Sequence, residues 1–298
     1  MRASACRENN LICHQKISFI SPKNLADYKY LFQRELDELY PKSEILSLYK
    51  IAVAEIMDIP FNRVAIEQHR EPNSYQHKKI EGVLLQLKQQ KPIQYILDKA
   101  YFLDLPLLLN EKVLIPRPET EELVLKVIES LGYDFSGSII DVGTGSGCIA
   151  LALKKFMPGA KITGVDKSAE AIEVAKKNGI ENNIDVQFLS LPVEEVDLNA
   201  FDIIVSNPPY IGWDEQNEMG DNVLKYEPGM ALFSDDPNYF YKYIAKQINP
   251  LKKGKCLFYE LNPKYAEEVK EFVSTCGFKD VEIELDLSGK KRMLIAGN

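Results

Sequence analysis

The segment Ile139-Ile-Asp141-Val-Gly143-Thr-Gly145-Ser-Gly147 indicates the fold of this chain. A short apolar run leads into three glycines at alternate positions, and a helical pattern starts at Cys148. Glycines let the backbone turn tightly and let a ligand approach the main chain closely. Their G-x-G-x-G spacing is no clean match to the G-x-G-x-x-G of dinucleotide sites. We therefore expect a strand, a ligand-binding turn and a helix in this order.

Strands and helices alternate from Ser138 to the C-terminus, which predicts a doubly wound α/β sheet. Only residues 286–290 separate the last two strands. Because a parallel crossover needs a dozen or more residues, these strands should form an antiparallel hairpin. The predicted strands are 138–142, 161–165, 185–189, 201–205, 255–260, 281–285 and 292–296, and the predicted helices are 148–156, 169–178, 237–248 and 266–276.

Residues 21–91 show the apolar spacing of three and four residues that is typical of helices. Leu25, Tyr28, Phe32 and Leu36 form one such stripe. We predict a small helical bundle, with helices near 25–36, 43–59, 61–69 and 74–90.

The chain is expected to divide into four parts. Residues 1–20 form a loose N-terminal tail, and residues 21–91 form the helical domain. Residues 92–117 form a linker with a short β-hairpin, because apolar runs surround the turn-forming residues within it. Residues 118–298 form the α/β domain, whose first helix has Pro118 at its favoured start position.

The composition is that of a soluble globular protein, with 45% hydrophobic and 27% charged residues among 298. A net charge of −8 argues against direct binding of nucleic acid over a broad surface. The five cysteines include no C-x-x-C pair and the three histidines are scattered, so we expect reduced thiols and no metal site. No segment has the pattern of a membrane span or signal peptide, which predicts a cytoplasmic protein without membrane partners.

Two acidic residues accompany the glycine turn. Asp141 ends the first strand, where its charge would disfavour a diphosphate but tolerate a cation. Asp166 ends the next strand, a position that takes the two ribose hydroxyls of a nucleoside. By itself Asp166 could equally be a loop acid or a helix cap, although Ser168 competes for the cap. Together these features fit a nucleoside with a positive group, S-adenosyl-L-methionine.

A second motif, Asn207-Pro-Pro-Tyr210, follows the predicted strand 201–205. Two prolines cannot continue a sheet ladder, so the chain should leave the sheet as a stiff loop. Asn207 offers a side-chain oxygen, Pro208 offers a carbonyl, and Tyr210 offers an aromatic face. Two acceptors beside a ring suit a planar –NH2 group, although the motif alone is explained equally well as an ordinary strand exit.

Four more segments complete a pattern that extends from about Pro22 to the C-terminus. They are Pro92-Ile-Gln-Tyr-Ile96, Leu114-Ile-Pro-Arg-Pro-Glu-Thr120, Tyr226-Glu-Pro228 and Ala231-Leu-Phe233. With the glycine turn and Val205-Ser-Asn-Pro-Pro-Tyr-Ile211, the chain resembles class I S-adenosylmethionine-dependent methyltransferases. More narrowly, it resembles the HemK/PrmC family of release factor glutamine N5-methyltransferases.

The resemblance implies a Rossmann-like methyltransferase sheet with an antiparallel C-terminal hairpin and an N-terminal helical bundle. It implies that the enzyme methylates the glutamine of the GGQ motif in peptide chain release factors, and that the bundle helps to dock them. The expected cofactor-binding residues are Asp141, Gly143, Thr144, Gly145, Ser146, Gly147, Asp166 and Asn207. The expected substrate-binding residues are Asn207, Pro208, Pro209 and Tyr210, of which Asn207, Pro208 and Tyr210 are catalytic, and Arg117 and Glu119 line a hinge beside the pocket.

The chain departs from the family pattern at four places. Relatives usually have glycine where Asp98 stands, and again near Asp104. Leu261-Asn262 replaces the usual Ile-Gly, and Ser190-Leu-Pro192 lacks the acid that many relatives carry after the third strand. The sequence therefore leaves the residue that contacts the adenine unidentified.

In the expected reaction, the Asn207 side-chain oxygen and the Pro208 carbonyl each accept one N–H of the substrate amide. Two alternatives remain open. A DNA or RNA adenine N6-methyltransferase could use the same acceptors on a flipped base, but the acidic balance and the lack of a target-recognition insert count against it. A nonenzymatic nucleotide-sensing adaptor would not need the intact Asn-Pro-Pro-Tyr motif.

Overall fold

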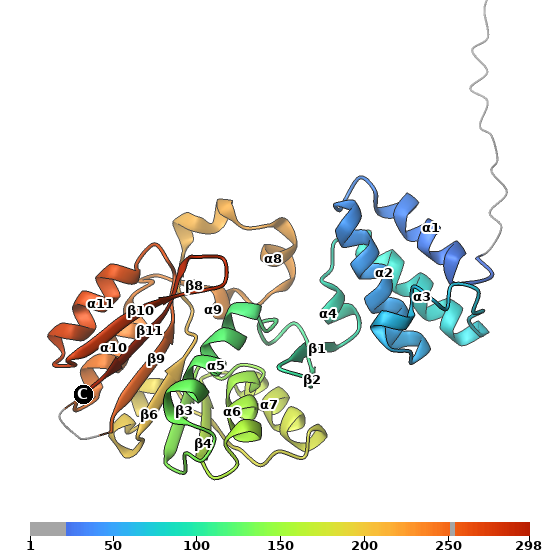
Figure 1. Cartoon of the computed structure of the whole chain (residues 1–298). Coiled ribbons are helices and arrows are strands. Elements are labelled where there is room, and N and C mark those ends of the chain that lie inside the picture. The colour runs from blue at the N-terminus through green and yellow to red at the C-terminus, as the bar shows by residue number, and fades with distance from the viewer. Residues whose placement is uncertain (1–21, 251–253) are drawn as a thin grey trace, which may run out of the picture. The chain divides into compact units, whose positions relative to one another are not determined.

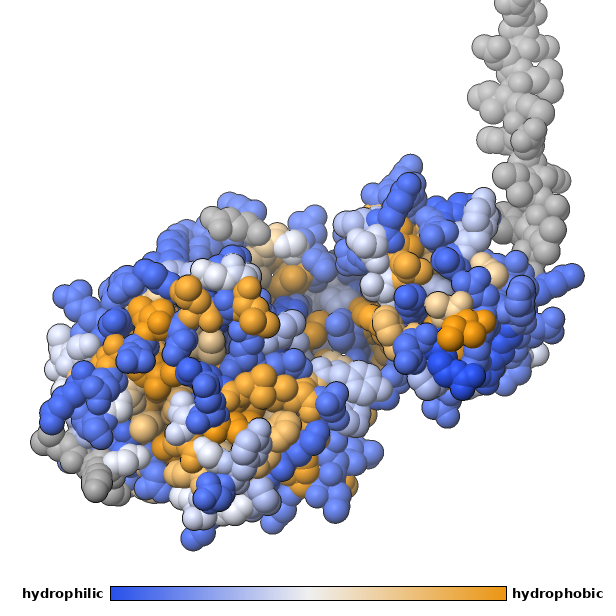
Figure 2. All heavy atoms as spheres, in the orientation of Figure 1, coloured by the Kyte–Doolittle hydropathy of each residue, from blue (hydrophilic) through white to orange (hydrophobic). Residues whose placement is uncertain are grey.

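The computed structural model describes residues 22–250 and 254–298, so the predicted tail at 1–20 lies outside the described residues. The chain divides into two units between Leu84 and Leu85 (Figure 1). In Figure 2, polar side chains surround scattered apolar ones on the visible face of each unit.

The described part of the first unit is helical, as the apolar spacing predicts. α1 begins with a reciprocal cap, in which the Asn24 side chain accepts from the Asp27 amide and the Asp27 carboxylate accepts from the Asn24 amide. The predicted stripe from Leu25 to Leu36 is fully buried. The helix predicted at 61–69 is only a short 3-10 turn. The elements are α1 (Leu25–Leu36), α2 (Lys42–Met57), η1 (Phe61–Arg63) and α3 (Ser74–Leu87), the last of which crosses the division.

A seven-stranded sheet forms the centre of the second unit, in the order β10-β11-β9-β6-β3-β4-β5. β3, β4, β5, β6 and β9 are parallel to their neighbours within this group, whereas β11 is antiparallel to both β9 and β10. The predicted C-terminal hairpin and doubly wound sheet are thus confirmed. The strands are β3 (Ser138–Val142), β4 (Lys161–Asp166), β5 (Gln187–Ser190), β6 (Ile203–Ser206), β9 (Cys256–Glu260), β10 (Asp280–Leu285) and β11 (Lys291–Gly297).

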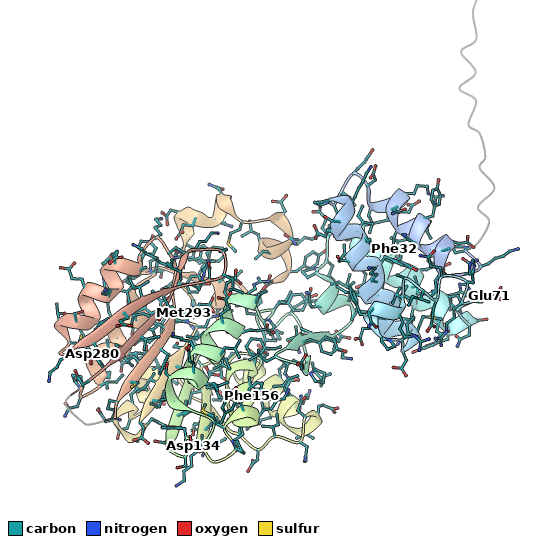
Figure 3. The ribbon with its side chains drawn as sticks, in the orientation of Figure 1. Phe32, Glu71, Asp134, Phe156, Asp280 and Met293 are labelled. Carbon is teal, nitrogen blue, oxygen red and sulfur yellow. The ribbon has the colours of Figure 1, made fainter. Side chains whose placement is uncertain are left out.

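Helices cover both faces of this sheet. Neighbouring residues of β3 point to opposite faces, so Ile139 packs in one apolar layer and Ile140 in the other. Met293 of β11, labelled in Figure 3, is buried in the layer of Ile139. That layer contains α5 (Pro118–Leu131), α6 (Cys148–Phe156) and α7 (Ala169–Glu181), and the opposite layer contains α10 (Tyr239–Gln247) and α11 (Ala266–Thr275).

The shorter elements of the second unit lie in the connections. They are α4 (Ile93–Ile96), η2 (Val193–Glu195), η3 (Leu198–Ala200), β7 (Ile211–Gly212), η4 (Trp213–Glu218), α8 (Asp221–Tyr226), α9 (Gly229–Leu232) and β8 (Phe233–Ser234).

Residues 92–117 pack within the second unit, whereas the sequence predicts a linker there. The predicted hairpin is present, as β1 (Lys99–Phe102) pairs antiparallel with β2 (Leu105–Leu108). Its backbone is fixed to α7, because Leu108 N donates to Asn178 Oδ1 at 2.6 Å and Asn178 Nδ2 donates to Leu108 O at 3.1 Å. The division between the units therefore precedes this segment.

Two aspartates of this segment adopt a backbone conformation that glycine reaches most easily. Asp98 has φ 53° and Asp104 has φ 60°, both in the left-handed region. Aspartate visits this region more readily than most residues with a Cβ. The chain path around the hairpin is thus compatible with the sequence departures at these positions.

Candidate active site

The glycine turn connects β3 to α6 in a left-handed backbone. Gly143, Gly145 and Gly147 have φ values of 76°, 52° and 82°. The amides of Gly143 and Thr144 both donate to Val165 O at 2.9 Å, which ties the turn to β4. A Cβ on Gly147 would lie 3.0 Å from Phe188 and 3.1 Å from Ala175, so these side chains would have to shift to admit one. Both the backbone conformation and the packing therefore favour glycine at this position.

Asp141 lies beneath the turn. Its Oδ2 atom accepts from Thr144 Oγ1 at 2.6 Å and from the Ala150 amide at 3.2 Å. Burial raises the pKa of Asp141 to about 7, although these two hydrogen bonds oppose the shift. Its Oδ1 atom has no hydrogen-bond partner within the described part of the chain. The structure places Asp141 where it supports the turn.

Asp166 joins the turn to the start of α7. Its Oδ2 atom accepts from the Gly145 amide at 3.0 Å, and its Oδ1 atom accepts from the Ser168 amide at 2.9 Å. Ser168 is the helix cap, because its hydroxyl accepts from the Ala171 amide. A carboxylate oxygen has more than one acceptor site, so Asp166 can also accept from ribose hydroxyls.

A cavity of about 510 Å³ opens at the C-terminal ends of β3, β4 and β6. This volume suits a small organic ligand, and the junction of β3 with β6 is where the strand order reverses, the usual site in such sheets. Gly143 and Gly145, which face the cavity, leave room for a ligand against their main chain. Of the predicted site residues, those on the wall are Gly143, Gly145, Asp166, Asn207, Pro208 and Pro209.

The other predicted residues lie outside this wall. Asp141 is buried beneath the turn, and Thr144, Ser146 and Gly147 are buried within it. Tyr210, Arg117 and Glu119 are partly buried nearby and do not line the cavity.

Several wall residues were not identified from the sequence. The segment after β5 contributes Leu191, Pro192 and Val193, where the sequence does not identify the residue that contacts the adenine. Pro228, Gly229, Met230 and Ala231 also line the wall, and the sequence indicates this part of it only through the family-like segments 226–228 and 231–233.

Asn207 is held by a buried chain of hydrogen bonds. Its Nδ2 atom donates to Thr120 Oγ1 at 3.0 Å, and that hydroxyl donates to Glu260 Oε2 at 2.6 Å. The Tyr210 hydroxyl donates to Glu260 Oε1 at 2.9 Å. Thr120 and Glu260 are buried, and burial raises the pKa of Glu260. The segments 114–120 and 205–211 therefore meet at the end of β9.

A further hydrogen bond supports the loop at 205–211, and an ion pair supports the segment before α5. Asn262 Nδ2 donates to the Tyr210 carbonyl at 3.1 Å, which gives the departure from the family's glycine a structural role. Arg117 pairs with the Glu227 carboxylate at 2.6 Å, and Glu227 is almost fully buried. This ion pair connects the segments 114–120 and 226–228.

Among the described residues, no group of three His, Cys, Asp or Glu side chains is arranged to hold a metal ion. In the same residues, no helix has the length and apolar character needed to cross a membrane.

A seven-stranded sheet with an antiparallel C-terminal hairpin, a glycine turn and an acid after the next strand together define a class I methyltransferase. The family model of the methyltransferase small domain matches residues 120–225. The hMettl16 catalytic domain, solved with the MAT2A 3′UTR hairpin 6, has a TM-score of 0.52 at 15% identity and shares the fold; the match covers 76% of this chain and 82% of that one.

Several relatives match almost the whole chain. The release factor glutamine methyltransferase of Flavobacterium psychrophilum is 38% identical over 278 residues, which cover 91% of this chain and 98% of that protein. The protein of the same name from Bacteroides thetaiotaomicron is 34% identical over 270 residues, which cover 89% and 96%. The chain belongs to the release factor glutamine methyltransferase family. The predicted family and enzyme class are confirmed, and S-adenosylmethionine is the cofactor.

We expect Asp166→Ala to weaken S-adenosylmethionine binding about tenfold or more, because unpaired polar groups of a ligand cost roughly 1–3 kcal/mol. Calorimetry of the purified enzyme measures this change. Asp185→Ala removes the same charge from an exposed position outside the cavity and should leave the dissociation constant unchanged. An unchanged dissociation constant for Asp166→Ala would remove this residue from the cofactor site.

Proposed function

We propose that this protein transfers a methyl group from S-adenosylmethionine to the side-chain amide nitrogen, N5, of a glutamine in a peptide chain release factor. The observation that carries the proposal is the shared cavity wall. Gly143, Gly145 and Asp166 lie on the same wall as Asn207 and Pro208. A methyl donor and an amide acceptor can thus meet there. The names of these relatives support the release factor as substrate, and we propose the GGQ-motif glutamine as the acceptor.

An amide nitrogen is a poor nucleophile, because its lone pair is delocalised into the carbonyl. The cofactor supplies a methyl group on a positively charged sulfur. Asn207 Oδ1 and the Pro208 carbonyl would each accept one N–H of the substrate amide and hold its nitrogen in line with that methyl. These acceptors also face the positive charge that develops on nitrogen. The proton leaves after transfer, and the products are N5-methylglutamine and S-adenosylhomocysteine.

The partners follow from this reaction. We propose that the first unit docks the release factor, since residues 22–84 contribute nothing to the cavity wall. A net charge of −8 supports the absence of direct nucleic-acid binding. A translation factor as substrate supports a cytoplasmic location.

The proposal is tested by incubating the enzyme with methyl-labelled S-adenosylmethionine and a purified release factor. We expect label in the wild-type factor and none in a factor whose acceptor glutamine is replaced by glutamate. Peptide mapping should locate the label on that glutamine. An adenine-containing oligonucleotide serves as a third substrate. Label in the oligonucleotide and none in the factor would overturn the proposal in favour of an adenine methyltransferase.

A further inference from the structure

We propose that Thr120 and Glu260 are positioning residues that determine which end of the Asn207 amide faces the substrate. This inference rests on the proposed function and deepens it. Neither residue lines the cavity, so each would act through Asn207.

The direction of the hydrogen bonds follows from the groups involved. An ionised carboxylate can only accept hydrogen bonds, so Glu260 must receive the hydroxyl protons of Thr120 and Tyr210. A threonine hydroxyl has one proton. With that proton donated to Glu260, Thr120 Oγ1 can only accept from Asn207, and the partner must be the Nδ2 donor.

The other end of the Asn207 amide is thereby defined. Because Nδ2 faces Thr120, Oδ1 lies on the opposite branch of the planar amide group. Asn207 lines the cavity, so this oxygen can meet an incoming amide N–H as an acceptor. If the Asn207 amide were reversed, a donor would face the donor of the substrate. Residues outside the cavity therefore determine whether Asn207 presents its acceptor oxygen or its donor nitrogen to the substrate.

The surroundings of Glu260 keep this arrangement in place. Glu260 and Thr120 are 1% and 2% exposed, so water does not compete for these hydrogen bonds. Burial raises the pKa of Glu260, while the hydrogen bonds from Thr120 and Tyr210, and then the positive charge of Arg292, oppose this rise and favour the acceptor-only form. Arg292 is itself fixed by Asp286 at 3.1 Å and by the Leu261 carbonyl at 3.2 Å.

The test compares Thr120→Val, which has no hydroxyl, with Thr120→Ser, which keeps one. In single-turnover transfer to the release factor, we expect Thr120→Val to be slower by about 10²-fold, the typical effect of a small misplacement of a reacting group. The KM for the release factor and the cofactor dissociation constant should stay close to the wild-type values. Thr120→Ser should restore most of the lost rate. Thr163→Val, which removes a buried hydroxyl from β4 outside this network, should keep the wild-type rate.

A second measurement needs no substrate. Hydrogen exchange of the Asn207 side-chain amide, followed by NMR and assigned by its absence in Asn207→Ala, reports the bond to Thr120. We expect protection in the wild type and in Thr120→Ser, and loss of protection in Thr120→Val. Wild-type rate or retained protection in Thr120→Val would overturn the positioning role. A wild-type enzyme that leaves the glutamine unmodified would instead overturn the proposed function, whatever the exchange result.

Discussion

Replacing Asn207 with Ala is expected to slow methyl transfer by about 10²–10³-fold, the usual cost of losing one oriented catalytic hydrogen bond. The prolines at 208 and 209 keep the loop shape, so the variant loses the acceptor and not the loop. Cofactor binding should change far less, because the glycine turn and Asp166 are untouched. The experiment measures single-turnover transfer to the release factor and, separately, the dissociation constant of S-adenosylmethionine.

Asn207→Asp tests whether an acceptor oxygen at this position is sufficient, or whether the side chain must also donate a hydrogen bond to Thr120. The aspartate offers an oxygen but has no donor for Thr120, whose proton is already donated to Glu260. Its charge would also stabilise the cationic ground state more than the transition state, where that charge disperses. We therefore expect a reduced kcat for this variant as well.

A matched control is Asn182→Ala, which removes an asparagine whose amide donates to the Pro106 and Asn178 carbonyls outside the cavity. It should keep the wild-type transfer rate. If Asn207→Ala turned over at a near wild-type rate, the proposed amide clamp would be wrong, and the loop would no longer be the acceptor site.

Local sequence signals were sufficient to predict the strands of the central sheet. Short segments that are apolar, or that alternate apolar and polar residues, predicted every strand of the central sheet to within a few residues. The short connection at 286–290 alone implied the antiparallel hairpin. The helix predicted at 61–69 is absent beyond Arg63, because a weak apolar pattern over so short a segment does not repay helix nucleation.

Contacts between distant segments could not be predicted in this way. Thr120 and Glu260 are 140 positions apart, and neither belongs to a motif that indicates a shared hydrogen bond. The hairpin at 92–117 belongs to the second unit through Asn178, which is 70 positions from Leu108. Asp141 was expected beside the ligand from its position in the motif, and only the packing shows that it is buried beneath the turn.

Removing the first unit should test release factor docking separately from methyl transfer. The contacts of the second unit determine where the shortened chain should begin. A start at Pro116 would delete Tyr95, whose hydroxyl donates to the Val113 carbonyl in a buried cluster against α7. It would also delete Gln89, whose carbonyl accepts from the Tyr226 hydroxyl beside the cavity-lining segment. A shortened enzyme of residues 88–298 keeps these contacts and every residue of the cavity wall.

This shortened enzyme should bind S-adenosylmethionine with wild-type affinity, because the glycine turn and Asp166 are complete. On the intact release factor, kcat/KM should fall by roughly 10²-fold or more, the effect of losing a second linked binding site. On a short peptide that contains the acceptor glutamine, the rate should equal that of the full chain, because such a peptide is too small to engage a separate docking unit. Wild-type cofactor affinity shows that the shortened enzyme is folded. Under that condition, full activity on the intact factor would show that the bundle does not dock the substrate, and an equal loss on the peptide would show that the bundle instead supports the chemistry.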